Sequence, residues 1–246
     1  MLIKNKIKSI IFLLFFFILN LNVGAEEFDI KAKEVLIDKE KEILIGTGSV
    51  EAIDSEGKVI VADKITYQKS KEFLKAEGNV NITDTEGNTI TSDIATYDKI
   101  NEIILTYNNS KIILKEGYKL KSKNISYDLK SEIMSSENNS IFTDKDGNYI
   151  ETTMFQYNIK KNLFTSVGKI KIIDVKKNKY FFKELHVDTK SREMIGSEVS
   201  VILDQENFGV SKESDPRFVA NHAVISENKT NLTKGVFTPC KKRGKK

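Results

Sequence analysis

The sequence has little of what enzymes and disulfide-stabilised proteins are usually built from. Among its 246 residues are one cysteine, two prolines, two histidines and no tryptophan. His186 and His222 stand apart, with no cysteine or carboxylate cluster at metal-ligand spacing. The sequence contains no nucleophile elbow, Walker loop or dinucleotide-binding glycine motif. We therefore expect a protein that is not an enzyme and that uses no cofactor or metal.

The first 25 residues have the pattern of a secretory signal peptide. Lys4, Lys6 and Lys8 precede an apolar run over residues 10–19, and Val23-Gly24-Ala25 supplies small residues for cleavage. The run is shorter than the ~20 residues that a spanning helix needs. We expect cleavage before Glu26 and export to the periplasm, with a retained membrane anchor as the alternative.

The charge of the chain is unevenly distributed along its length. Three lysines of the signal segment and five basic residues at 241–246 outweigh the total net charge of +4, which leaves about −4 for the body. That balance argues against nucleic acid as a partner. The basic tail would either touch a phosphate-rich surface or be a solvated or truncated end. The mature part, residues 26–240, has the length and the Ile, Val, Thr, Tyr and Phe content of one all-β domain.

A thirty-residue period organises the chain. The blocks 59–88, 89–118, 119–148 and 149–178 align, and the period extends to residues 30–37 and 180–187. After an insertion of eight residues, 220–225 gives a weaker last copy. Two columns mark the register: Tyr67, Tyr97, Tyr127, Tyr157, and Gly57, Gly87, Gly117, Gly147. Such a period indicates a stacked array, here of about six repeats and a degenerate cap.

Each repeat contains two extended segments joined by turns. In the first complete block, residues 59–68 and 73–84 flank a polar link at 69–72, and Glu86-Gly87 makes the outer turn, where glycine can adopt positive φ. Short β-rich runs joined by polar links predict hairpins. We expect antiparallel pairing through about a dozen strands.

Side-chain columns predict that the ribbon is bent. In the second segment the apolar columns share one parity, so they lie on one face of a strand. In the first segment Ile60 and Ile65 have opposite parity, and a regular strand cannot send both inward. We therefore expect a bulge near Asp63-Lys64 and its equivalents, since one extra residue restores the inward direction. A bend at the same place in every repeat gives a V-shaped β-jelly roll with an apolar trough.

The trough has two interpretations. Closed by its own side chains, it is a core; left open, it is a groove for an apolar ligand. A column of small residues, Ala76, Thr106, Ser136 and Ser166, would leave room in it. The predicted groove positions are Ile60, Ile65, Leu74, Ile82, Ile90, Ile104, Ile112, Leu120, Ile125, Met134, Phe142, Ile150, Phe155, Phe164 and Ile172.

The repeat resembles a known family. Ala62-Asp63, Tyr67 and the run Ala-Glu-Gly-Asn-Val at 76–80, in an exported thirty-residue register, are similar to the OstA-like repeat. That repeat builds lipopolysaccharide-transport proteins: the periplasmic bridge protein (LptA-like) and the N-terminal domain of the outer-membrane assembly protein (LptD-like). The resemblance implies a jelly roll that shields the acyl chains of lipopolysaccharide and joins other jelly rolls by edge-strand pairing.

The end of the chain is similar to the outer-membrane member. The run NLTKGVFTPC at 231–240 looks like that family's passage toward its barrel, which implies a disulfide from Cys240 to a barrel and a lipoprotein partner. No barrel follows, because the chain stops at Lys246. We therefore also expect a free-standing bridge protein as an alternative. A structural or adhesive β-solenoid with a dry core is a second alternative, and an enzyme acting on lipid A a third.

Overall fold

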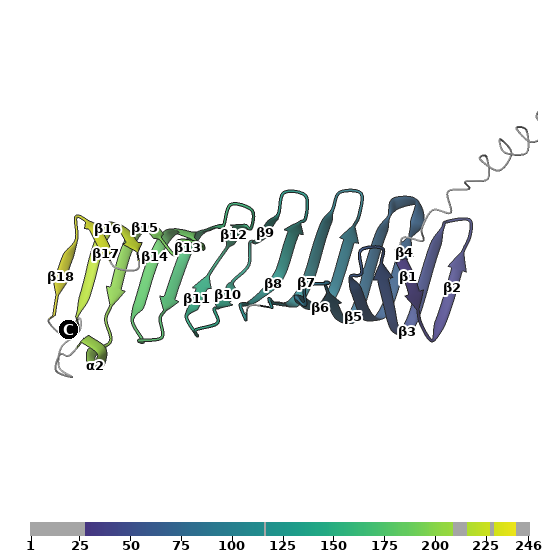
Figure 1. Cartoon of the computed structure of the whole chain (residues 1–246), viewed down its shortest axis with the longest axis horizontal. Helices are drawn as coiled ribbons and strands as arrows, with labels where there is room; N and C mark the ends of the chain where they lie inside the picture. The colour runs from purple at the N-terminus through teal and green to yellow at the C-terminus, as the bar shows by residue number, and fades with distance from the viewer. Residues whose placement is uncertain (1–27, 116, 209–215, 227–228, 240–246) are drawn as a thin grey trace, which may run out of the picture.

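The computed structural model describes residues 28–115, 117–208, 216–226 and 229–239, which form an elongated, almost entirely β structure (Figure 1). A 3-10 turn, η1 (Lys69–Lys71), and a four-residue helix, α2 (Gln205–Phe208), are the helical elements of this described part. The strands are β1 (Phe28–Lys31), β2 (Glu34–Asp38), β3 (Ile43–Asp54), β4 (Val59–Gln68), β5 (Phe73–Thr83), β6 (Thr89–Asp98), β7 (Ile103–Ile113), β8 (Lys119–Asp128), β9 (Ile133–Ser136), β10 (Ser140–Thr143), β11 (Tyr149–Thr152), β12 (Phe155–Asn158), β13 (Leu163–Ile173), β14 (Lys179–Asp188), β15 (Met194–Ile202), β16 (Arg217–Ser226), β17 (Lys229–Thr233) and β18 (Val236–Thr238).

The strands make one antiparallel sheet in which neighbours in the sequence are neighbours in space. β3 pairs with β4 and so on to β8, and β13 pairs with β14 and so on to β16. Between them, β9 and β10 both pair with β8, β12 pairs with β9 and β11 with β10, and β11 and β12 both pair with β13. β1 and β2 both pair with β3, and β17 and β18 both pair with β16, so these pairs form the two ends of the array. The predicted all-β hairpin array is confirmed. The strand number is eighteen rather than about a dozen, because several extended segments break in two where the sheet bends.

The bend lies between Ile60 and Ile65, where the opposite parity of these two residues predicted it. Ala62 and Ile65 are both buried, with Asp63 and Lys64 exposed between them. The predicted extra residue is on the neighbouring strand, β5, and not at Asp63-Lys64, which corrects the sequence-based assignment. Val61 pairs with Asn81 but Lys64 pairs with Glu77, so the pairing advances by four residues along β5 and by three along β4. The surplus is taken up at Gly78 and Asn79, whose φ angles are +76° and +46°. Glycine and asparagine tolerate this left-handed conformation better than most residues do.

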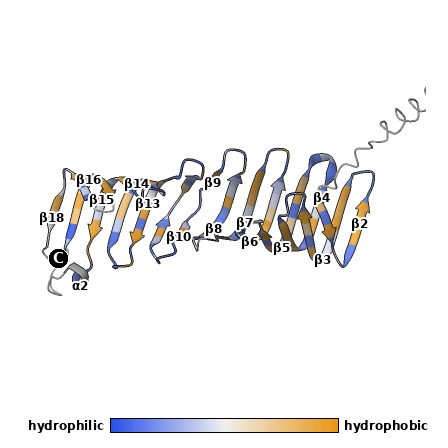
Figure 2. Cartoon of the chain, in the orientation of Figure 1, coloured by the Kyte–Doolittle hydropathy of each residue, from blue (hydrophilic) through white to orange (hydrophobic). Residues whose placement is uncertain are grey.

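The bend divides every ribbon into two arms. We call the half that ends at turns such as 54–58 the turn arm, and the half that ends at links such as 69–72 the link arm. Hydrophobic and hydrophilic residues alternate along the strands of both arms (Figure 2). Because strand side chains alternate between faces, each arm has an inner face directed at the other arm and an outer face in solvent.

Short polar contacts close both kinds of turn. In the turn arm, the Asp84 carboxylate accepts the backbone N–H groups of Glu86 and Asn88 at 2.9 and 2.8 Å. Gly87 follows in the left-handed region at φ +91°, as predicted. In the link arm, the Asp98 carboxylate accepts the side-chain amide of Asn101 at 2.7 Å and its backbone N–H at 3.0 Å, and these hydrogen bonds lower the pKa of Asp98. These side-chain-to-backbone bonds explain why the repeat can reverse direction without proline.

Candidate lipid-binding trough

The structure brings all fifteen predicted groove residues onto the inner faces of the two arms. They belong to two hydrophobic clusters that follow one another along the array, the first containing Ile60 to Ile104 and the second Ile112 to Ile172 and beyond. Ile90, Phe142 and Ile150 are half-buried. The other twelve are buried: Ile60, Ile65, Leu74, Ile82, Ile104, Ile112, Leu120, Ile125, Met134, Phe155, Phe164 and Ile172.

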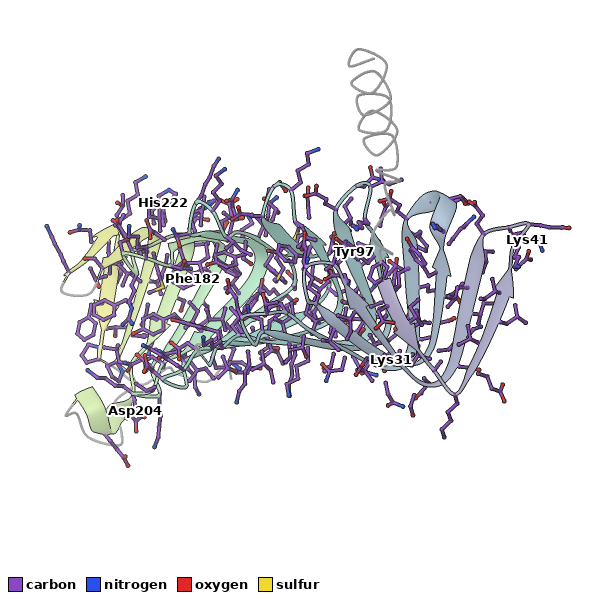
Figure 3. All side chains as sticks on the ribbon, turned by 45° about the vertical axis from the view of Figure 1, so that its right-hand side comes forward. Lys31, Lys41, Tyr97, Phe182, Asp204 and His222 are labelled. Carbon is purple, nitrogen blue, oxygen red and sulfur yellow. The ribbon has the colours of Figure 1, made fainter. Side chains whose placement is uncertain are left out.

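Side chains of the two arms touch one another across the trough. Phe142 of the turn arm lies with its ring centre 5.0 Å from that of Phe164 of the link arm. At the N-terminal end, the rings of Phe28 and Tyr67 make the same kind of edge contact at 5.1 Å. In Figure 3, Tyr97 and Phe182 lie between the two layers of the ribbon, whereas Lys41 projects into solvent. The trough in this structure is therefore filled by its own side chains.

The small-residue column does not leave the room predicted for it. Ala76 is fully buried, and Thr106 and Ser166 are each only 2% exposed. At the last copy, Gly196, the space of a side chain is already filled by the ring of Phe182. The small residues thus allow neighbouring side chains to pack closely at the inside of the bend. The sequence showed their size but not which neighbours would occupy the space.

A belt of buried hydroxyl groups lines the inside of the bend in the middle repeats. The Ser140 hydroxyl donates to the Ser122 hydroxyl at 3.0 Å, and the Ser122 and Ser136 hydroxyls are 2.9 Å apart. One repeat further, the hydroxyls of Thr152 and Ser166 bond to each other. Buried polar groups need such partners. The sequence analysis missed this belt as a polar feature, although the serine and threonine letters in its inner columns were the available indication.

The mouth of the trough is formed by half-buried side chains near the tips of both arms. We call these the rim residues: Ile90, Phe142, Ile150 and Tyr180 from the turn arm, and Tyr127, Tyr157, Val187 and Met194 from the link arm. The Tyr180 hydroxyl donates to the Asp174 carboxylate at 3.0 Å, and burial together with that carboxylate raises the pKa of Tyr180 to about 12. Burial also raises the pKa of Tyr127. The rim thus combines apolar surface with hydroxyl tips.

Two hollows of the described surface lie away from the inner rows. One, of about 500 Å³, is lined by residues around Ile173, Lys179 and Leu203 at the base of α2; the other, of about 290 Å³, lies outside the bend near Asn79 and Asp93. None of the fifteen predicted groove residues lines either hollow. Space for a ligand among the inner rows would therefore come from separating the arms.

The described residues show no arrangement with evident catalytic chemistry. They contain no group of three or more His, Cys, Asp or Glu side chains able to hold a metal ion. His186 and His222 are exposed on strands of the link arm. No helix among the described residues has the length and apolar character to cross a bilayer. Cys240, the predicted signal peptide and the basic tail at 241–246 lie outside the described residues.

The chain was compared with family models, curated proteins and solved structures, and the solved structures gave a match. No family model and no curated protein matches the sequence. Among solved structures the chain is similar to LptH of Pseudomonas aeruginosa, described as the LptA-homologous periplasmic component of the lipopolysaccharide transport device. The two share 14% identity over 44% of this chain and 79% of that chain, with a TM-score of 0.40.

Proposed function

We propose that this chain binds the acyl chains of lipopolysaccharide between its two arms and passes the lipid along the array toward the outer membrane. The observation that carries the proposal is the continuity of the inner rows, which recur at the same positions in successive repeats and form two consecutive clusters. An acyl chain exposed to water costs about 0.8 kcal/mol per methylene, and apolar rows can offset that cost. Because the rows repeat, neighbouring repeats offer similar binding sites, and movement between them needs no chemistry.

Opening the trough would leave the backbone of the sheet intact. The pairings of the ribbon join neighbouring strands within one arm or along the bend, as in β10 with β11 and β9 with β12. The aromatic contacts between the arms, such as Phe142 with Phe164, are made by side chains. An acyl chain entering past the rim residues would exchange one set of apolar contacts for another. Opening would therefore break side-chain contacts between the arms and leave the strand pairings in place.

The two ends of the array offer surfaces for further jelly rolls. Val35, Leu36 and Ile37 of β2 are 48%, 60% and 62% exposed, and Val236 of β18 is 66% exposed. An edge strand with exposed apolar side chains can accept another strand by β-augmentation. We propose that these ends pair with other transport jelly rolls, as the OstA-like resemblance implies.

Two finer versions of the proposal differ in the partner of the C-terminal end. In the first, residues 26–240 act as the N-terminal periplasmic domain of an outer-membrane assembly protein, and Cys240 forms a disulfide with a barrel assisted by a lipoprotein. In the second, the chain is a free-standing periplasmic bridge. A non-reducing gel of the protein from its own cells distinguishes them, since the first version gives a Cys240-dependent covalent adduct and the second gives none.

A dry structural array is the competing function, and the burial of the inner rows favours it. Ile65 and Leu185 are completely buried, as expected for a core that never opens. Photo-crosslinking residues in place of Ile104, Met134 and Phe164 separate the two functions. The matched controls are the neighbouring outward positions Leu105, Ser135 and Thr165, on the same three strands.

The lipid proposal predicts lipopolysaccharide adducts at the three inward positions and none at the three outward ones. Equal labelling of both sets would show contact with the outside of the sheet only. Absence of adducts at the inward positions, in variants whose circular dichroism matches the unmodified protein, would favour the dry array. Release of fatty acid or sugar from lipid A by the purified protein would instead revive the enzymatic alternative.

A further inference from the structure

We propose that the outer face of the turn arm between β7 and β14 is a docking surface for an anionic lipid bilayer. This stretch carries a set of outward lysines, which we call the basic face: Lys111, Lys119, Lys121, Lys123, Lys169, Lys171, Lys179 and Lys183. The alternation of burial places them outside; in β8, for example, Lys119, Lys121 and Lys123 are exposed while Leu120 and Ser122 between them are buried. The basic face is on the opposite side of the sheet from the trough.

Lysines of β7 and β8 lie next to one another across the two strands. Lys111 of β7 is directly opposite Lys121 of β8, and Lys119 and Lys123 flank Lys121 on the same face. Like charges placed directly opposite in a sheet are destabilising. Lys171 pairs with Glu151 at 3.8 Å and Lys183 with Glu198 at 2.8 Å. The other six lysines of the basic face make no ion pair within the described ranges.

In the link arm of the same strands, the strand residues include carboxylates and no lysine. Its outward strand carboxylates in β7 to β14 are Asp128, Glu184 and Asp188, whereas its lysines lie in the links at the tips of the arm. On the turn arm, Glu151 is the carboxylate among the described outward strand residues from β7 to β14. Among the strand residues, cations and anions therefore lie mainly on different outer faces of the ribbon. A solvated surface without a binding role would be expected to intersperse the two signs.

The form of the basic face favours a membrane over a protein or a single small anion. The lysines come from four strands of the turn arm, β7, β8, β13 and β14, with β10 and β11 between the two pairs, so they span about 24 Å of sheet at the usual spacing between strands. Lysine is depleted from protein–protein interfaces. All eight cations are lysines, which act as point charges, and none is the bidentate arginine that suits one defined phosphate. Spread lysines on an open sheet suit the many phosphates of an anionic lipid surface.

The test measures binding of the full chain to vesicles of phosphatidylcholine alone and of phosphatidylcholine with phosphatidylglycerol. The variant Lys111→Gln/Lys119→Gln/Lys121→Gln/Lys123→Gln removes half of the basic face. The matched control, Lys130→Gln/Lys160→Gln/Lys161→Gln/Lys190→Gln, removes four exposed lysines from the links at the tips of the other arm. Both variants keep the same N-terminal segment and basic tail, so contributions from the termini are equal in the comparison.

We expect the basic-face variant to lose at least about tenfold in affinity for the anionic vesicles, whereas the control changes little. The affinity of the unsubstituted protein should fall with added salt, because salt screens exposed charges. Acetylation of lysines in the vesicle-bound protein should spare Lys119, Lys121 and Lys123 and modify Lys130 and Lys160. This readout locates the contact on the molecule and is independent of acyl binding in the trough.

Three results would overturn the proposal. The first is equal loss of affinity in the two quadruple variants, which would indicate a response to net charge alone. The second is acetylation of the basic face in the bound state. The third is tighter binding to duplex DNA or to an acidic protein than to anionic vesicles at the same salt concentration, which would assign the basic face to another class of partner. Crosslinking of lipopolysaccharide inside the trough could succeed or fail independently of all three.

Discussion

Substitution of Gly78 by alanine tests whether the inside of the bend needs glycine for space as well as for conformation. Gly78 has φ +76°, and an added Cβ would overlap the Asp63 carboxylate and lie 3.0 Å from the Asp63 Cβ and Cγ. Asp63 in turn accepts a hydrogen bond from the Asn79 side chain at 2.9 Å. Alanine at this position should therefore incur backbone strain and also displace Asp63 from its partner.

The expected loss follows from two separate terms. A left-handed conformation costs a non-glycine residue about 1–2 kcal/mol, and displacement of a hydrogen-bonded side chain adds about 1 kcal/mol. We expect Gly78→Ala to lower the free energy of unfolding by about 2–3 kcal/mol. Gly87→Ala is the matched control, because Gly87 has φ +91° but no atom within 4 Å of an added Cβ; its loss should be about 1–2 kcal/mol.

Urea unfolding followed by circular dichroism measures both losses, and the second variant Asp63→Ala isolates the steric term. In the double variant Asp63→Ala/Gly78→Ala the overlap with the carboxylate is removed and only the 3.0 Å contact with the Cβ of residue 63 remains, so the combined loss should be smaller than the sum of the two single losses. If Gly78→Ala costs no more than Gly87→Ala, or if the two substitutions at the bend are additive, the reasoning about crowding at the bend is wrong.

Two further predictions concern the tip of the turn arm near the last repeats. Lys177 takes the left-handed position (φ +63°) that Gly57, Gly87, Gly117 and Gly147 occupy in earlier repeats, so Lys177→Gly should raise the free energy of unfolding by about 1 kcal/mol; no gain, with Gly147→Lys also neutral, would contradict this. The pKa of Tyr180, raised from 10.0 to about 12, means that its neutral form is favoured in the folded state, so the stability it contributes is present below pH 10 and is lost as the pH rises through about 12. The phenolate absorbance of Tyr180 is obtained by subtracting the spectrum of Tyr180→Phe from that of the unsubstituted protein. It should appear as the pH approaches about 12, and its appearance near pH 10 would refute the burial argument.

Local periodicity was sufficient to predict most of the fold. Side chains alternate with a period of two along a strand, so the thirty-residue columns identified the inner rows, and Ile65 and Leu74 are buried as expected. The opposite parities of Ile60 and Ile65 located the bend. The turns were also readable, because Gly87 adopts the positive φ that its place in the repeat required. Each of these features depends on residues that are close together in the chain.

The contacts between arms, strands and faces were decided only in three dimensions. Which strand of a pair takes the extra residue at a bend depends on its partner, and the structure places the surplus at Gly78-Asn79 instead of Asp63-Lys64. Whether the trough is filled depends on side chains from different arms, such as Phe142 and Phe164. The net charge of the body did not indicate the basic face, because it adds strand lysines to strand carboxylates that the bend assigns to different outer surfaces.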